Sequence, residues 1–142
     1  MPGCNLIKQY GPLLGRVLIS LIFILSGWGK IGHFDQTLGY MASKGIPLTE
    51  LALIATIVIE LGGGLMILLG WRTRLAALIM FLWLIPVTLT IHNFWGAPAD
   101  QMQNQLNHFL KNIAIMGTMV YLMAFGSGPL SLGKHHRTDN QE

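Results

Sequence analysis

The sequence predicts an all-α integral membrane protein, a four-helix bundle with one short interfacial helix between spans one and two. Its composition is the first observation that predicts this fold. Apolar residues make up 52% of the chain and charged residues only 11%, and the mean hydropathy is +0.54. Soluble domains carry roughly 25% charged residues, so this chain has too few charges to cover a water-facing surface. The composition therefore excludes a disordered chain, a nucleic-acid-binding module and a secreted fold held by disulfides.

The second observation is a set of four long apolar segments, at about residues 12–29, 48–70, 75–95 and 106–125. Each is close to the ~20 residues that a helix needs to cross ~30 Å of hydrocarbon. A soluble bundle would need a polar outer face on every helix, and these segments lack such faces. We therefore expect a single membrane domain, residues 1–142, with a tail at 126–142.

The first segment follows Lys8 and is apolar, as in a signal peptide, but no small-residue cleavage site comes after it. We therefore expect a retained helix. In the connection that follows, Phe34, Leu38 and Met41 recur at helical spacing, which indicates a short amphipathic helix on the outer surface. At the start of the second span, Thr49 is expected to cap the helix, and Glu50 is an acid in the first turn, where the helix dipole favours negative charge.

The next two features concern the third span. Residues 70–74, Gly-Trp-Arg-Thr-Arg, form a tight basic corner that makes the second and third spans antiparallel neighbours. Pro86 is expected to kink the third span or to free a carbonyl near the middle of the membrane.

Basic residues in the loops predict the orientation. The side that holds both termini and the 70–74 corner carries five bases, and the opposite side carries two, Lys30 and Lys44. The five are Lys8, Arg72, Arg74, Lys134 and Arg137. The positive-inside rule then predicts that both termini lie in the cytoplasm.

The polar residues inside the spans form one stripe per helix. Arg16, Ser20, Gly27 and Lys30 share a face of the first span, and Thr56, Glu60, Gly63 and Gly64 share a face of the second. Thr88 and His92 form the stripe of the third span, and His108, Lys111, Asn112 and Thr118 that of the fourth. Ionisable groups are expensive in a membrane, at ~2.5 to 3.5 kcal/mol each on insertion scales. The four stripes therefore predict a shared polar interior.

A rise of ~1.5 Å per residue gives the expected depths. Glu60 comes near the middle of its span, Arg16 ~5 Å toward the cytoplasm and Lys111 ~8 Å toward the outside, and both basic side chains are long enough to approach the carboxylate. His92 comes near the outer end, beside Lys111 and Asn112. One interpretation is a buried Arg16–Glu60 ion pair that only fixes helix register. The other is a small pocket for a polar or amphipathic molecule.

The order and spacing of these residues give the chain a family resemblance. It resembles the DoxX family of small four-span bacterial and archaeal membrane proteins, from LLGRVLISLIFILSGWGKI to GSGPLSL. The shared stretches include IELGGGLMILLG, TRLAA, the His92–Trp95 stretch and FLKN at 109–112. The residues that match the family pattern are Arg16, Lys30, Glu60, His92, Lys111 and Asn112.

The resemblance implies a four-helix bundle in the cytoplasmic membrane. The family takes its name from a subunit of a thiosulfate:quinone oxidoreductase, and some relatives are associated with thiol-redox partners. Cys4 is the chain's only cysteine, and no flavin or haem motif is present. We therefore expect no metal site and no self-sufficient catalytic motif, so that redox chemistry would come from a bound molecule or another subunit.

Three functional hypotheses remain open. In the leading one, the chain is a component of a membrane redox or stress-linked system that binds quinone or a similar amphipathic ligand. The ligand's carbonyls would accept hydrogen bonds from Arg16, Lys111, His92 or Asn112, and a proton would pass by way of Glu60. The alternatives are a structural or assembly subunit whose buried charges only fix packing, and a small proton or solute carrier. Expected partners are the lipid bilayer, a redox subunit and a second copy of the chain, and not nucleic acid.

Overall fold

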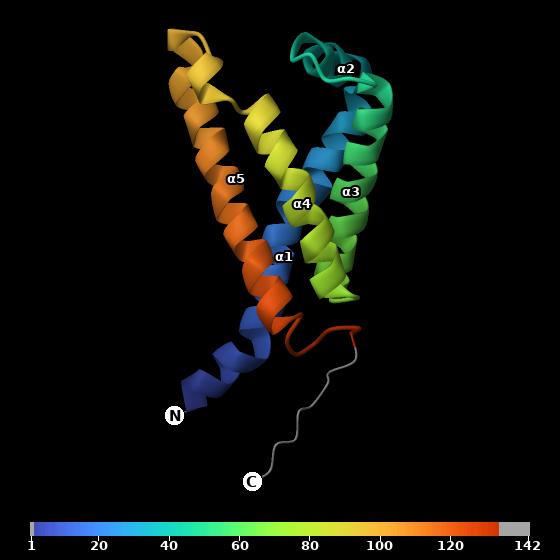
Figure 1. Cartoon of the computed structure of the whole chain (residues 1–142). Coiled ribbons are helices and arrows are strands. Elements are labelled where there is room, and N and C mark those ends of the chain that lie inside the picture. The colour runs from blue at the N-terminus through green and yellow to red at the C-terminus, as the bar shows by residue number, and fades with distance from the viewer. Residues whose placement is uncertain (1, 134–142) are drawn as a thin grey trace.

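The computed structural model describes residues 2–133 and shows an all-helical bundle (Figure 1). Its helices are α1 (Pro2–Gly32), α2 (Phe34–Ser43), α3 (Thr49–Leu69), α4 (Thr73–Ile91) and α5 (Ala99–Phe125), with a single 3-10 turn, η1 (Phe94–Gly96). Four of them, all except α2, are long and apolar enough to cross a membrane. The predicted fold class is confirmed, although α1 and α5 extend well beyond the apolar windows that predicted them.

The connections explain why these helices begin and end where they do. Gly70 ends α3 with a φ of +69°, a left-handed conformation that glycine adopts at no steric cost. Only Gly70 to Arg72 separate α3 from α4, so the expected tight corner is confirmed. The short helix α2 occupies the expected place between the first two spans. The proposed Thr49 cap is wrong, because the Thr49 hydroxyl donates backward to the Ile46 carbonyl at 2.7 Å.

The helices associate as two pairs, α1 with α3 and α4 with α5, and α3 also packs on α4. Figure 1 shows the pairs close together near the α3–α4 corner and diverging toward the end that carries α2. The apolar core lies mainly in the converging half and reaches the other half at Phe23, Leu84 and Ile115. It comprises Phe23, Ile67, Ala76, Ala77, Met80, Leu84, Ile115, Met119 and Leu122.

Two glycines allow the close approach in this half. A Cβ atom on Gly64 would lie 3.1 Å from Ile24 and 3.3 Å from Phe23 on α1. A Cβ atom on Gly63 would lie 2.5 Å from the Met80 sulfur on α4. These residues therefore serve helix packing, since the absence of a side chain lets neighbouring helices come near.

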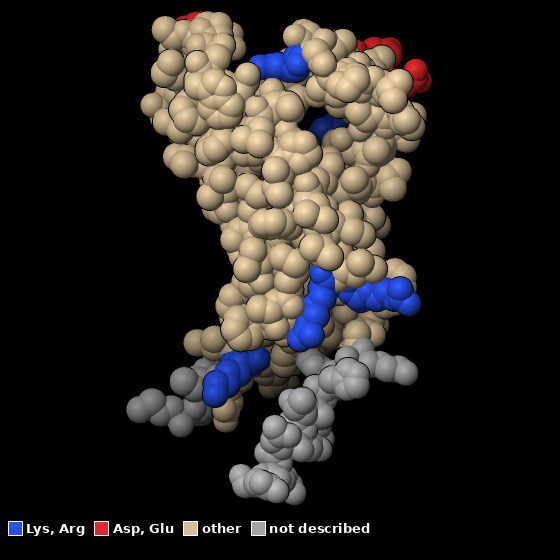
Figure 2. Space-filling model, viewed as in Figure 1, with Lys and Arg blue, Asp and Glu red and all other residues tan. Residues whose placement is uncertain are grey.

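Charged residues are unevenly distributed between the two ends. The exposed acids Asp35, Glu50 and Asp100 lie in the first turns of α2, α3 and α5, at the end with α2. Figure 2 shows the red side chains gathered at that end, whereas blue side chains lie at both ends. The basic residues Lys134 and Arg137 and the rest of the predicted tail beyond residue 133 lie outside the described residues.

Candidate ligand-binding site

The diverging half of the bundle encloses a cavity of about 770 Å³. Its wall includes residues from all five α-helices and from the loop between α2 and α3. Figure 2 shows an opening in the surface near the α2 end, with a basic side chain inside it. The volume is in the range of pockets that hold cofactors and drug-sized ligands.

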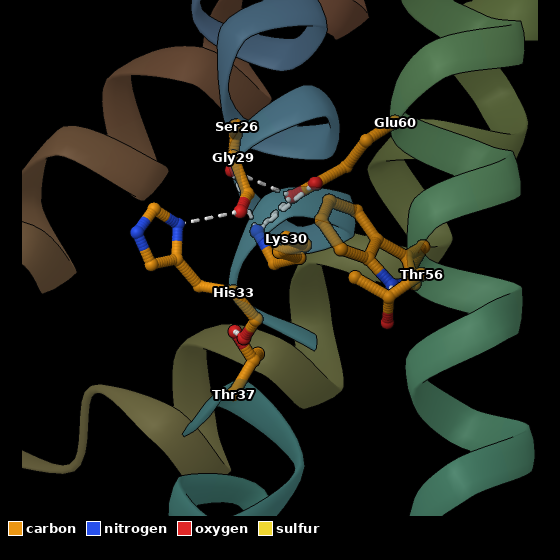
Figure 3. A network of polar contacts seen from close by, with 8 residues as sticks. Ser26, Gly29, Lys30, His33, Thr37, Thr56 and Glu60 are labelled. Atoms are coloured by element: carbon orange, nitrogen blue, oxygen red, sulfur yellow. Dashed lines mark hydrogen bonds and ion pairs between the residues drawn. The ribbon is translucent and has the colours of Figure 1, made fainter. Parts of the chain in front are cut away.

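A closed ion pair forms one polar wall of the cavity. The Lys30 amine lies 3.0 Å from each carboxylate oxygen of Glu60 and donates to the Ser26 hydroxyl at 2.6 Å. Ser26 in turn donates to Glu60 at 3.1 Å. Figure 3 shows these three side chains pointing toward one another between α1 and α3. The Glu60 side chain is only 5% exposed, so its charge is compensated by this neighbour.

The helical geometry explains why Lys30 reaches Glu60. Side chains lean toward the N-terminus of their own helix, and α1 and α3 are antiparallel. Lys30 therefore leans back along α1 while Glu60 leans toward it along α3. Just beyond the pair, the His33 ring contacts the Gly29 carbonyl at 3.1 Å, and Thr37 donates to the His33 carbonyl at 2.9 Å (Figure 3).

A second polar wall comes from α4 and α5. The His92 and His108 rings are stacked with their centroids 5.0 Å apart. His92 Nδ1 lies 3.1 Å from the Gln105 side-chain oxygen, and the Lys111 amine lies 3.1 Å from His108 Nδ1. Asn112 donates to the Thr88 hydroxyl at 3.1 Å, which fixes the amide against α4.

The partner of each ring favours one tautomer of the neutral imidazole. With the Gln105 oxygen as its partner, a neutral His92 has its proton on Nδ1 and its lone pair on Nε2. With the Lys111 ammonium as its partner, a neutral His108 accepts at Nδ1 and has its proton on Nε2. The site thus offers one ring acceptor, one ring donor and the two remaining Lys111 protons.

The rest of the wall is apolar. Ile22 and Phe23 contribute from α1, Leu84 from α4 and Ile115 from α5. Trp83 also lines the cavity, and its indole nitrogen donates to Thr56 at 3.4 Å. A molecule held here would contact polar groups on one side and hydrocarbon on the other.

Five of the six predicted site residues line this cavity: Lys30, Glu60, His92, Lys111 and Asn112. That they bind a ligand stays a prediction. Lys111 lies near enough to Glu60 to interact with it electrostatically, but its amine makes its hydrogen bond with His108 and not with the carboxylate.

Arg16 is not at this site, and the expected Arg16–Glu60 contact is wrong. The Arg16 guanidinium is 1% exposed and donates to the Leu68 carbonyl at 3.1 Å and the Leu130 carbonyl at 2.6 Å, with Pro129 at 3.5 Å. The last carbonyls of a helix have no partner within it and attract cations. Arg16 therefore caps α3 and fixes the segment after α5 beneath the bundle.

The corner end also carries a hollow, of about 810 Å³, beside the Gly70–Leu75 corner and the segment after α5. Arg72 and Arg74 line it, and Arg74 donates to the Ala124 carbonyl at 3.4 Å. These two arginines belong to the basic corner expected from the sequence. The hollow shares no residue with the cavity between the diverging helices.

Sequence reasoning missed three contributors to the site. His108 was recognised only as part of a stripe, and its stacking on His92 depends on tertiary structure. Ser26 stands four residues before Lys30, a spacing that places both on one helix face, and this signal could have been used. Lys44, in the loop after α2, also lines the cavity and donates to Asn93 at 3.4 Å.

Comparison with known proteins supplies the family. The DoxX family model matches residues 11–93, more than half of the chain. The chain belongs to the DoxX family. The inner membrane protein YphA of Escherichia coli is 34% identical over 86% of this chain and 87% of YphA. The inner membrane protein YqjF of the same organism is 32% identical over 90% of this chain and 93% of YqjF.

A more distant relative is CatD of Bacillus subtilis, which its name describes as a candidate oxidoreductase. It is 32% identical over 58% of this chain and 60% of CatD. No solved structure is significantly similar. With four apolar helices and two inner-membrane relatives that it matches over most of their length, this DoxX protein is a multi-pass inner-membrane protein.

Proposed function

We propose that this DoxX protein binds quinone, or a similar amphipathic ligand, in the cavity between its diverging helices, as the membrane component of a redox or stress-linked system. The observation that carries the proposal is the cavity itself, about 770 Å³ with polar groups gathered on two walls and hydrocarbon between them. A tightly packed bundle whose charges only fixed register would not need this space.

The polar groups match a quinone headgroup. Lys111 has two amine protons free of the His108 contact, and a quinone carbonyl accepts hydrogen bonds. The lone pair on His92 Nε2 can accept from the hydroxyl of the reduced form. Lys30 is a poor donor to a ligand, because its three protons are used by Glu60 and Ser26.

The redox part of the proposal rests on CatD, the relative whose name describes an oxidoreductase. With one cysteine, the chain has no dithiol of its own. In this proposal its residues bind and orient the ligand, and another subunit exchanges electrons with it.

The test is to purify the protein in a non-ionic detergent and to measure co-purified quinone and the binding of a short-chain quinone. Lys111→Met removes the free donor, and we expect it to weaken binding about 10-fold, the value of one charge-assisted hydrogen bond. Lys8→Met is the matched control, because Lys8 is exposed on α1 and lines no part of the cavity. Absence of both co-purified quinone and quinone binding would contradict the proposal.

The closed Lys30–Glu60 pair favours a second candidate function, a structural or assembly subunit. In that case the polar residues stabilise the α1–α3 contact and no ligand is required. Filling the cavity with a large side chain would then leave function intact, whereas it would abolish function under the first proposal.

We also propose that the α3–α4 corner faces the cytoplasm and that the cavity opens toward the outer side. Lys8, Arg72 and Arg74 at the corner end support this through the positive-inside rule. A membrane-impermeant thiol reagent applied to intact spheroplasts should label Asp35→Cys on α2, in a Cys4→Ser background, and should not label native Cys4. Labelling of Cys4 without labelling of Asp35→Cys would show that the protein has the opposite orientation.

A further inference from the structure

The cavity contains more positive than negative side chains. Among the described residues, three lysines line it, Lys30, Lys44 and Lys111, and the only acid that does so is Glu60. Two positive charges are therefore in excess, even with both histidines neutral. The exposed acids at the same end, Asp35, Glu50 and Asp100, are not part of the wall.

The single carboxylate is already occupied. Both Glu60 oxygens contact the Lys30 amine at 3.0 Å, and Ser26 donates to one of them as well. Glu60 thus neutralises Lys30 and has little capacity left for a second cation. Within the described part of the chain, neither Lys44 nor Lys111 forms an ion pair with an acid.

The two remaining lysines are in different situations. Lys44 lies in the loop after α2, where it donates to Asn93 and its amine lies 5.5 Å from the centre of the Tyr40 ring. Lys111 is an exposed residue of the transmembrane helix α5, and within the described part of the chain its one side-chain hydrogen-bond partner is the His108 ring. A cation in a membrane needs a counter-charge or water, because hydrocarbon does not solvate it.

We infer that the natural ligand is an amphiphile with one negative charge on oxygen at its polar end, placed at Lys111. Such a ligand supplies the missing counter-charge, and its apolar body contacts Ile22, Phe23, Leu84 and Ile115. The enolate of an alkyl hydroxyquinone and the carboxylate of a fatty acid share this chemistry. The inference rests on the proposed function and narrows its ligand class.

The test compares probes that differ only in charge, on the full chain in non-ionic detergent. One pair is a 2-hydroxy-3-alkyl-1,4-naphthoquinone, ionised at neutral pH, and the same naphthoquinone without the hydroxyl group. A second pair is a medium-chain fatty acid and the alcohol of the same length. We expect the anion of at least one pair to bind about 10- to 100-fold more tightly, as a charge-assisted bond to Lys111 would give.

Three variants assign the effect to the residue. Lys111→Met should remove the preference for the anion, Lys111→Arg should keep most of it, and Lys8→Met should leave it unchanged. Thermal unfolding in the same detergent checks that each variant is folded. If Lys111→Met is unfolded, Lys111→Gln, which keeps the polar group without the charge, takes its place.

The outcomes separate the inference from the proposed function. Equal binding of neutral and charged naphthoquinones, with no preference in the fatty pair, overturns the inference and leaves quinone binding standing. Preference for the fatty acid without binding of either quinone supports the inference and contradicts quinone as the ligand. If Lys111→Met still prefers the anion, the charge is recognised at another residue and the inference is overturned. If none of the four probes binds, both the inference and the proposed function are overturned.

Discussion

A double-mutant cycle on Lys30 and Glu60 tests the packing of α1 on α3 most directly. Glu60→Leu leaves the Lys30 amine with Ser26 as its only partner, and Lys30→Met leaves a carboxylate that is 5% exposed without a cation. Breaking a buried pair by removing one partner costs about 3 to 5 kcal/mol. Because the Lys30 side chain keeps 23% exposure, we expect each single variant to lose ~2 to 4 kcal/mol of unfolding free energy.

The double variant Lys30→Met with Glu60→Leu should recover most of this loss. Two apolar side chains can replace a buried ion pair at little cost, so we expect it within ~1 kcal/mol of the wild type and a coupling energy of ~3 kcal/mol or more. The measurement is equilibrium unfolding in mixed micelles of a non-ionic detergent and sodium dodecyl sulfate. Strict additivity of the two single losses would refute the reasoning.

Arg16 provides the control for this cycle. Its guanidinium binds backbone carbonyls at the end of α3 and in the segment after α5, not Glu60. Arg16→Met should therefore destabilise the protein on its own, and its effect should add to that of Glu60→Leu within ~0.5 kcal/mol. Strong coupling between Arg16 and Glu60 would instead support the Arg16–Glu60 ion pair that was expected from the sequence.

Three further variants and one control variant test packing and the cavity. Gly27→Ala should lower the thermal unfolding temperature, because its Cβ would lie 2.8 Å from Leu61, whereas Gly29→Ala, with nothing within 4 Å, should not. Gly70→Ala should destabilise by ~1 to 2 kcal/mol or more in the same mixed-micelle unfolding assay, since φ there is +69° and the new atom would collide with Arg16. Ala52→Phe, on the cavity wall, should leave the unfolding temperature near that of the wild type and block binding of the short-chain quinone. Unchanged quinone binding in that variant would show that the ligand does not occupy the cavity.

The fold was predictable because lipid leaves few alternatives. Four apolar segments of about 20 residues can only become helices in a membrane, since every backbone group must be hydrogen-bonded within its own segment. The glycine at the end of α3 and the three-residue corner fixed the antiparallel arrangement. One polar stripe per helix then indicated the interior, and five of the six proposed site residues do line one cavity.

The pairing of charges was not predictable from the apolar windows, because centring each window in the membrane gives the wrong register. Contacts at Gly27 with Glu60 and Leu61, and at Gly64 with Phe23 and Ile24, set the true register of α1 against α3. In that register, Arg16 lies opposite the corner, about 11 residues or ~16 Å along α3 from Glu60. Small residues on the facing helices, Gly27 on α1 and Gly64 on α3, were the sequence signal from which this register could have been predicted.

The same register explains why the cavity lies where it does. Near the corner, Gly63 and Gly64 draw α3 onto its neighbours, and Arg16 closes the end by capping α3. Toward α2, the facing side chains include the Lys30–Glu60 pair on one side and His92 and His108 on the other, and these do not interdigitate as leucines would. The helix pairs therefore diverge, and the space between them is bounded by groups that need a polar partner. Ligand recognition thus belongs to the open half and the Arg16 and Gly70 contacts to the closed half, so Lys111→Met and Gly70→Ala should affect different measurements.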